Sequence, residues 1–332
     1  MDELICKPSA EVLEAVRRCE GNFVVLGAGG KMGFHLSRLL QRSLQILGRA
    51  DTITVVSRFS SGNSSDPFRD HGFDVLPADI SDPDQLKRIP DAANVLFLAG
   101  IKFGTSGDSG LLEKMNSQMP RAVAQRFCKS RIVALSTGCV YSFTSPESGG
   151  STEQSDTDPP GEYAQSCLGR ERAFVDGSLE HGTPCSLVRL NYAIDLRYGV
   201  LVDIAQQVKA GVPVNLQTGY VNVIWQGDAA AQILQCFPKT NSPPWIINVT
   251  GSQTLRVRDL AEQFAIRFGT SAKFEGTEAS ACWLNDSTLA RQTFGEPTVS
   301  VEQMIDWIAD WIEQDGQTLG KPTHFQTRDG NY

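Results

Sequence analysis

The sequence predicts an α/β fold built on a doubly wound parallel sheet. Short apolar segments suited to buried strands recur up to residue 190, helical segments lie between most of them, and a glycine-rich turn directly follows the first. Parallel strands need long, right-handed crossovers, so strands that alternate with helices build an open sheet with helices on both faces.

Six segments are expected to form the strands of this sheet. The first is a continuous apolar run, which is typical of a strand buried on both faces. The six segments read NFVVL, TITVVSR, FDVLPADI, NVLFLAG, RIVALSTG and CSLVRLNY. Phe34, Leu36, Leu39 and Leu40 predict a helix after the first strand, and further helices are expected near residues 82–88, 111–129 and 163–180.

The chain is expected to have three regions. Residues 1–20 form a helical extension, residues 21–190 carry the main sheet, and residues 191–332 form a smaller α/β lobe interleaved with the last strands of the sheet. The final helix is expected to begin after Ser300, with Gln303 completing a capping box.

Composition excludes several classes of protein. The chain of 332 residues is 41% apolar, which is enough for a sizeable core, and its formal charge of -8 argues against a nucleic-acid or anionic-membrane partner. The eight cysteines form no CxxC pair and no zinc-ligand spacing, so reduced thiols and no metal are expected. No signal peptide and no apolar stretch of membrane-spanning length is present, which predicts a cytoplasmic protein.

The turn GAGGKMG after the first strand predicts a dinucleotide site. Gly27, Gly30 and Gly33 are spaced three apart, and Gly29 adds freedom between them. Glycines here let the backbone turn, approach a diphosphate and pack the next helix closely, while the N-terminus of that helix offers unpaired N–H groups to the anion. The turn residues Lys31 and Met32 complete the expected contact. The alternative is a glycine-rich turn that has lost its ligand.

The end of the second strand bears on the choice of cofactor. Ser57 stands where NAD-binding chains carry an acidic residue, and Arg58 follows it, so NADP is favoured over NAD. The alternative is that Arg58 is merely an exposed arginine. Asp79 and Ile80 follow the third strand, where a partner of the adenine amino group is expected.

These motifs together resemble the extended short-chain dehydrogenase/reductases, the family of NAD-dependent epimerases and dehydratases that includes UDP-galactose 4-epimerase. The resemblance covers residues 22–313 and rests on GAGGKMG, ADI, LAGIK, LSTGCVY, YAQSCLGRERAF, QGDAAA and INVTGSQTLRVRDLAEQF. It implies a Rossmann-fold NAD(P)-binding domain. It also implies cofactor contacts at Leu98, Ala99, Gly100 and Lys102, and a site-shaping role for Asn116.

The resemblance implies a catalytic pair with one member of the usual set replaced. Thr137 matches the hydroxyl that bonds the substrate, and Tyr163 matches the proton-transferring phenol. Cys167 occupies the place of the lysine that would lower the pKa of that phenol. Lys102 or Arg170 is a possible substitute cation, and Cys167 is either a nucleophile or an inert buried thiol.

Two function classes follow. One is an NAD(P)-dependent oxidoreductase, epimerase or dehydratase that acts on a hydroxyl or keto group of a small, sugar-like molecule. A nucleotide-diphosphate sugar is disfavoured, because Val221 and the loop FEGTEASACW lack the family's diphosphate-binding arginines. The other is a non-catalytic NAD(P)-binding sensor or regulatory protein that lost the lysine.

A homodimer is also expected. The family resemblance implies pairing through the helices near residues 111–129 and 163–180. The first of these carries more apolar side chains than one sheet face needs, namely Leu112, Met115, Met119 and Phe127. These side chains also suit a monomer core.

Overall fold

The chain forms two compact units in the computed structural model, which describes residues 1–60, 64–101 and 109–328. Unit 1 comprises Met1–Thr137, Gln165–Arg189 and Ala230–Ile247, and unit 2 comprises Gly138–Ala164, Leu190–Ala229 and Asn248–Tyr332. The interleaving is therefore deeper than a single boundary at residue 190. The first 20 residues belong with the sheet, and residues 138–164 belong with the second unit.

Unit 1 is built around a seven-stranded sheet. Its strands are β1 (Phe23–Leu26), β2 (Ile53–Ser57), β3 (Asp74–Pro77), β4 (Asn94–Phe97), β5 (Arg131–Thr137), β6 (Cys185–Leu190) and β11 (Trp245–Val249). The strand order is β11-β6-β5-β4-β1-β2-β3, and β1 pairs in parallel with both β2 and β4. All six predicted strands lie within their expected segments, and the predicted α/β class with a doubly wound sheet is confirmed.

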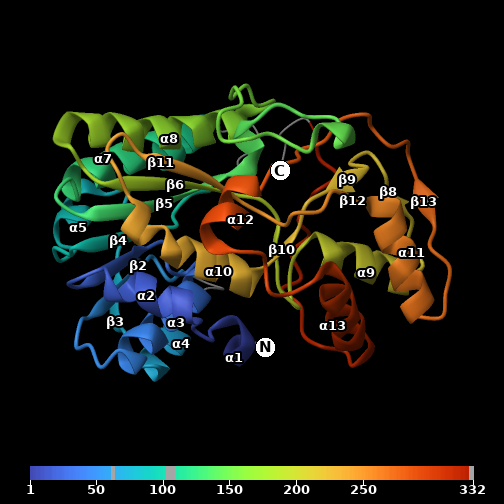
Figure 1. Cartoon of the computed structure of the whole chain (residues 1–332), viewed down its shortest axis with the longest axis horizontal. Helices are drawn as coiled ribbons and strands as arrows, with labels where there is room; N and C mark the ends of the chain where they lie inside the picture. The colour runs from blue at the N-terminus through green and yellow to red at the C-terminus, as the bar shows by residue number, and fades with distance from the viewer. Residues whose placement is uncertain (61–63, 102–108, 329–332) are drawn as a thin grey trace. The chain divides into compact units, whose positions relative to one another are not determined.

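Helices cover both faces of this sheet (Figure 1). Those of unit 1 are α1 (Asp2–Ile5), α2 (Ala10–Arg17), α3 (Gly33–Ile46), α4 (Asp66–Asp70), α5 (Pro83–Lys87), α6 (Ser109–Glu113), α7 (Met119–Arg126) and α8 (Glu162–His181), together with the later part of α10 (Gln226–Gln235) and the 3-10 turn η4 (Phe237–Lys239). On one face, buried side chains of α5, α7 and α8 pack on the strands, with the rings of Phe97 and Phe174 5.0 Å apart. Near the other face, Phe23 of β1 meets Phe237 edge to face at 5.6 Å. Burial on both faces explains why the central strands β1 and β4 are largely apolar.

The helix predicted over 111–129 is interrupted. A π-helical turn, η1 (Lys114–Gln118), separates α6 from α7. Such turns insert an extra residue into a helix and occur frequently at functional sites. This one carries Asn116, which is fully buried.

The apolar residues that suggested a dimer interface lie in the core of unit 1 itself. Leu112, Met115, Met119 and Phe127 are all buried within the chain. Three of them belong to the cluster that packs on the sheet. These four side chains are therefore not available to a partner subunit. They no longer support the expected homodimer.

Unit 2 is assembled from short paired strands and helices. The strands are β7 (Ala193–Ile194), β8 (Val214–Asn215), β9 (Tyr220–Val221), β10 (Ile224–Trp225), β12 (Leu255–Arg256) and β13 (Phe274–Glu275). The helical segments are α9 (Val200–Ala210), α11 (Val257–Arg267), α12 (Thr288–Phe294) and α13 (Val301–Glu313), with the 3-10 turns η2 (Gly138–Val140) and η3 (Pro146–Ser148). The predicted capping box is present at α13, where the Ser300 hydroxyl accepts from the Gln303 amide at 3.2 Å and the Gln303 side chain accepts from the Ser300 amide at 3.0 Å.

Candidate functional site

Two cavities of unit 1 lie at different edges of the sheet. One, of about 170 Å³, is lined by residues that directly follow β1, β3 and β4 and by the end of β2. The other, of about 480 Å³, is lined in part by residues that precede β1, β4 and β5. Open parallel sheets bind ligands at the carboxyl ends of their strands, so the smaller cavity is the candidate site.

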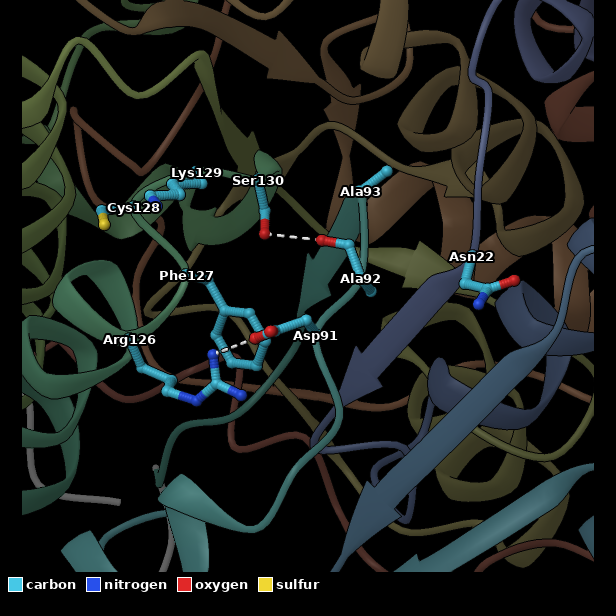
Figure 2. Close-up of a pocket in the computed structure, with 9 residues that line it drawn as sticks. All are labelled: Asn22, Asp91, Ala92, Ala93, Arg126, Phe127, Cys128, Lys129 and Ser130. Carbon is cyan, nitrogen blue, oxygen red and sulfur yellow. Dashed lines mark hydrogen bonds and ion pairs between the residues drawn. The ribbon is translucent and has the colours of Figure 1, made fainter.

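Two hydrogen-bonded contacts span the lining of the larger cavity (Figure 2). Arg126 donates to a carboxylate oxygen of Asp91 and to the carbonyl of Ile89, both at 2.6 Å. Ser130 donates to the carbonyl of Ala92 at 2.7 Å. These bonds hold the chain ends that enter β4 and β5, so the groups have a structural role there.

Ten sequence-predicted cofactor residues surround the smaller cavity. They are Gly27, Gly29, Gly30, Ser57, Arg58, Asp79, Ile80, Leu98, Ala99 and Gly100. Val56, Phe59, Ser60, Ala78 and Met115 complete the lining. Each of these five flanks a predicted residue in the sequence, so widening each motif by two positions would have found them.

The glycine turn owes its shape to close backbone packing. Gly27 has φ +83°, and a Cβ on it would lie 2.6 Å from the amide nitrogen of Ala99. A Cβ on Gly33 would overlap the carbonyl of Ala28, so only glycine lets α3 begin this close to the strand. Gly30 is different, because a Cβ there would meet only the Gly27 carbonyl at 3.3 Å and would occupy the cavity wall.

The part of the cavity lining that follows β2 and β3 carries one positive and one negative side chain. Arg58 is exposed, and Asp79 is half-buried. Burial by itself raises the pKa of Asp79, but the hydroxyl and amide of Ser81 donate to its carboxylate at 2.7 and 2.9 Å. With the nearby charges of Arg58 and Lys114, these bonds bring the pKa of Asp79 below its ordinary value. The cavity is therefore lined by an ionised carboxylate and by an exposed guanidinium.

Several predicted cofactor residues do not line this cavity. Lys31 and Met32 follow the glycines in the turn, and Gly33 acts through packing against Ala28. Asn116 lies behind the wall, next to Met115. Lys102 lies outside the described residues.

Asn116 ties the end of β4 to α8. Its Oδ1 accepts from the amide of Ile101 at 3.2 Å, and its Nδ2 donates to the carbonyl of the same residue at 3.1 Å. Nδ2 also donates to the Ser166 hydroxyl at 2.8 Å. The amide thus fixes the backbone directly after Gly100.

A buried ion pair anchors the middle of α8 beneath β5 and β6. Arg189 donates through Nε and Nη2 to the two oxygens of Glu171, at 2.9 and 2.7 Å. The Ser136 hydroxyl donates to Glu171 at 2.6 Å. This two-point pairing neutralises Arg189 within the fold.

Two of the predicted catalytic residues lie at the ends of elements, and the third lies one turn inside a helix. Thr137 is the last residue of β5 and is half-buried. Tyr163 is in the first turn of α8 and is half-buried, and Cys167 follows one turn later with no exposed surface. Of the two states considered for Cys167, the buried thiol is the one found.

The described residues lack two kinds of feature. They contain no cluster of three or more His, Cys, Asp or Glu side chains able to hold a metal ion. None of their helices is long and apolar enough to cross a membrane.

Comparison with known proteins gives matches by structure alone. No protein-family model matches the sequence, and no curated protein is significantly similar to it. UDP-glucose 4-epimerase from Thermotoga maritima, solved with UDP-glucose, is 17% identical with a TM-score of 0.72, covering 89% of this chain and 99% of that one. UDP-glucuronic acid 4-epimerase from Bacillus cereus, solved with NAD, is 19% identical with a TM-score of 0.73, covering 88% and 99%.

A third similar structure is dTDP-glucose 4,6-dehydratase from Streptomyces venezuelae, solved with NAD bound. It is 18% identical with a TM-score of 0.73, covering 89% of this chain and 97% of that one. At such identities the likeness is one of fold. The protein has a Rossmann-like fold.

Proposed function

We propose that this protein binds a nicotinamide dinucleotide at the glycine turn and is an oxidoreductase of the extended short-chain dehydrogenase/reductase type. The observation that carries the proposal is the gathering of ten predicted cofactor residues around one cavity at the carboxyl ends of the strands. The residues fit the group, because Gly27 allows the tight turn against Ala99 and Gly30 leaves space where a side chain would enter the cavity. Solved structures of the same fold contain NAD.

In this proposal Tyr163 and Thr137 handle the proton of the substrate. A bound dinucleotide supplies a hydride acceptor or donor. The phenol of Tyr163 takes or returns a proton at its oxygen, and the Thr137 hydroxyl orients the substrate by a hydrogen bond. The Ser136–Glu171–Arg189 contacts support this pair, because they anchor α8 and the end of β5.

The substrate is proposed to be a small, sugar-like molecule with a hydroxyl or keto group. The structures with a similar fold include enzymes named for nucleotide sugars. In unit 2 of this chain, however, Glu278 binds Arg256 at 2.9 Å and Arg258 at 3.3 Å, and the hydrogen bond from Arg256 lowers the pKa of Glu278. These two arginines are already neutralised in part, which disfavours them as ligands of a substrate diphosphate.

NADP is the cofactor we favour. Ser57 places no carboxylate at the end of β2, and the exposed Arg58 lines the cavity. A charge-assisted contact between Arg58 and a 2'-phosphate is worth roughly 1.5 to 3 kcal/mol, or about ten- to hundredfold in affinity.

Replacing Arg58 by alanine tests this preference. We expect Arg58→Ala to lose about ten- to hundredfold in affinity for NADP while NAD binding stays within about twofold. Arg69→Ala, which removes another exposed arginine in α4, serves as the matched control. Equal affinities of the wild type for the two cofactors would contradict the preference.

A second candidate is a non-catalytic NAD(P)-binding sensor. The observation that favours it is the buried thiol of Cys167, which supplies no cation near Tyr163. The two candidates share cofactor binding and differ in turnover.

Calorimetric titration with NAD+, NADH, NADP+ and NADPH tests the shared step. We expect binding by the wild type and none by Gly30→Val, because the new side chain would stand in the cavity wall. The thermal midpoint of that variant should stay close to that of the wild type, since Gly30 has no positive φ and no backbone atom closer than 3.3 Å to its Cβ position. Unchanged affinity in Gly30→Val would remove the assignment of this cavity.

A further inference from the structure

Arg170 is a buried cation to which the proposed mechanism gives no role. Its side chain projects from the middle of α8, and the residue is 7% exposed. Nη1 donates to the carbonyl of Leu135 at 3.2 Å, and Nη2 donates to Oδ1 of Asn116 at 2.7 Å. Nε is buried and has no hydrogen-bond partner among the described residues. Within the part of the chain that the structure describes, only neutral groups hydrogen-bond to this guanidinium.

The buried charges of unit 1 do not balance. Apart from His35, the buried titratable side chains of its described, non-cysteine residues are Arg170, Glu171 and Arg189. Glu171 already forms a two-point ion pair with Arg189 and accepts a bond from Ser136. One positive charge is therefore left over at Arg170. A buried charge without a counter-ion is strongly unfavourable, so its retention points to an anion that arrives with a ligand.

The position of Arg170 identifies where that anion would lie. A Cβ on Gly100 would overlap Nη2 of Arg170, so the guanidinium packs directly against the backbone of Gly100. Gly100 lines the candidate cavity, as does Met115, the neighbour of Asn116. Gly27 of the glycine turn packs against Ala99, the residue before Gly100. The guanidinium of Arg170 thus lies directly behind Gly100 in the cavity wall. It is close to the glycine turn, whose backbone suits a diphosphate.

We propose that Arg170 is the counter-charge for the diphosphate of a nucleotide bound at the glycine turn. The inference rests on the proposed cofactor binding and adds the residue that favours phosphorylated ligands there. Arg170 acts across Gly100 rather than by direct contact, and through Asn116 it also holds the backbone after Gly100. Protein rather than water separates Arg170 from the proposed diphosphate. The attraction between the guanidinium and the diphosphate is therefore only weakly screened.

The test compares a ligand that carries the diphosphate with one that lacks it. Affinities for ADP and adenosine are measured by calorimetry for the wild type, Arg170→Met, Arg170→Gln and Arg170→Lys. We expect the two neutral variants to lose about ten- to hundredfold in ADP affinity and less than about threefold in adenosine affinity. Arg170→Lys should recover most of the ADP affinity. Without ligand, the neutral variants should unfold at the same temperature as the wild type or higher, because they remove an uncompensated charge.

Arg172→Met is the matched control, since Arg172 is an exposed arginine on the same helix. It should change neither affinity. Equal losses for ADP and adenosine, unchanged ADP affinity, or failure of both neutral variants to fold would overturn the inference. If the wild type binds neither ADP nor any nicotinamide dinucleotide, the proposed function itself fails. ADP binding that ignores Arg170 overturns only the inference.

Discussion

Cys167 is the residue on which the choice between enzyme and sensor depends. It lies one helical turn after Tyr163 in α8 and has no exposed surface. A cation at this place would stabilise the phenolate of Tyr163, typically by about 1 to 3 pKa units. A buried thiol supplies no such charge. The wild type is therefore expected to bind cofactor well and to turn over slowly.

Replacing Cys167 by lysine should repair the site if the rest of it is intact. We expect Cys167→Lys to raise turnover of bound cofactor on a panel of sugars and hydroxy acids, by up to about a thousandfold if each pKa unit is fully expressed in rate. The control is the double variant Cys167→Lys with Tyr163→Phe, which should fall back to background. A folded, cofactor-binding Cys167→Lys protein that stays inert on the whole panel would favour the sensor.

At the scale of elements, the unit formed by β1, the glycine turn and α3 shows that the three glycines have different roles. Gly27 and Gly33 are required by the backbone atoms packed against them, whereas Gly30 borders the cavity. The spacing of three in the sequence does not distinguish these roles. The atoms that do, Ala99 N and Ala28 O, come from the packed structure.

Alanine substitutions should separate packing from binding in this unit. We expect Gly33→Ala to lower the free energy of unfolding by roughly 1 to 3 kcal/mol or more, because its Cβ would overlap a main-chain carbonyl. Gly30→Ala is the matched control and should stay within about 0.5 kcal/mol. Urea denaturation of both variants measures the difference, and equal stabilities would contradict the assigned roles.

On the scale of the whole molecule, self-association remains a prediction. The apolar residues that suggested it are core, but α8 presents Leu179 with 61% of its surface exposed. Three residues earlier on α8, the exposed Asp176 pairs with Arg121 of α7 at 3.9 Å. An exposed leucine beside complementary charges suits the centre of a modest interface.

Light scattering at tens of micromolar protein measures the assembly state. We predict a homodimer for the wild type and a monomer for Leu179→Lys, because a charge would be buried at the centre of the contact. The control is Ile266→Lys, which changes an apolar side chain that is 77% exposed on α11 of unit 2. This variant should stay dimeric. A monomeric wild type would rule out the dimer.

Local patterns along the chain were sufficient to predict the strands, the alternation of strand and helix, the glycine turn and the α13 capping box. Each of these depends on residues within about one element, such as the apolar run Phe23–Leu26 or the Ser300–Gln303 pair. Such patterns reflect burial periodicity and backbone hydrogen bonding, which the sequence carries directly. Ten of the predicted cofactor residues line one cavity, because each lies at or just after the end of a strand of the same parallel sheet.

Only the packed chain decided the rest. The π-helical turn that buries Asn116, the pairing of Glu171 with Arg189, and the assignment of residues 138–164 to the second unit all depend on contacts between segments far apart in the sequence. Arg170 is the clearest case. From sequence alone it is only a possible substitute cation on a helix, and its meaning arises because α8 brings it against Gly100, Asn116 and the Leu135 carbonyl, where no carboxylate of the described residues hydrogen-bonds to it.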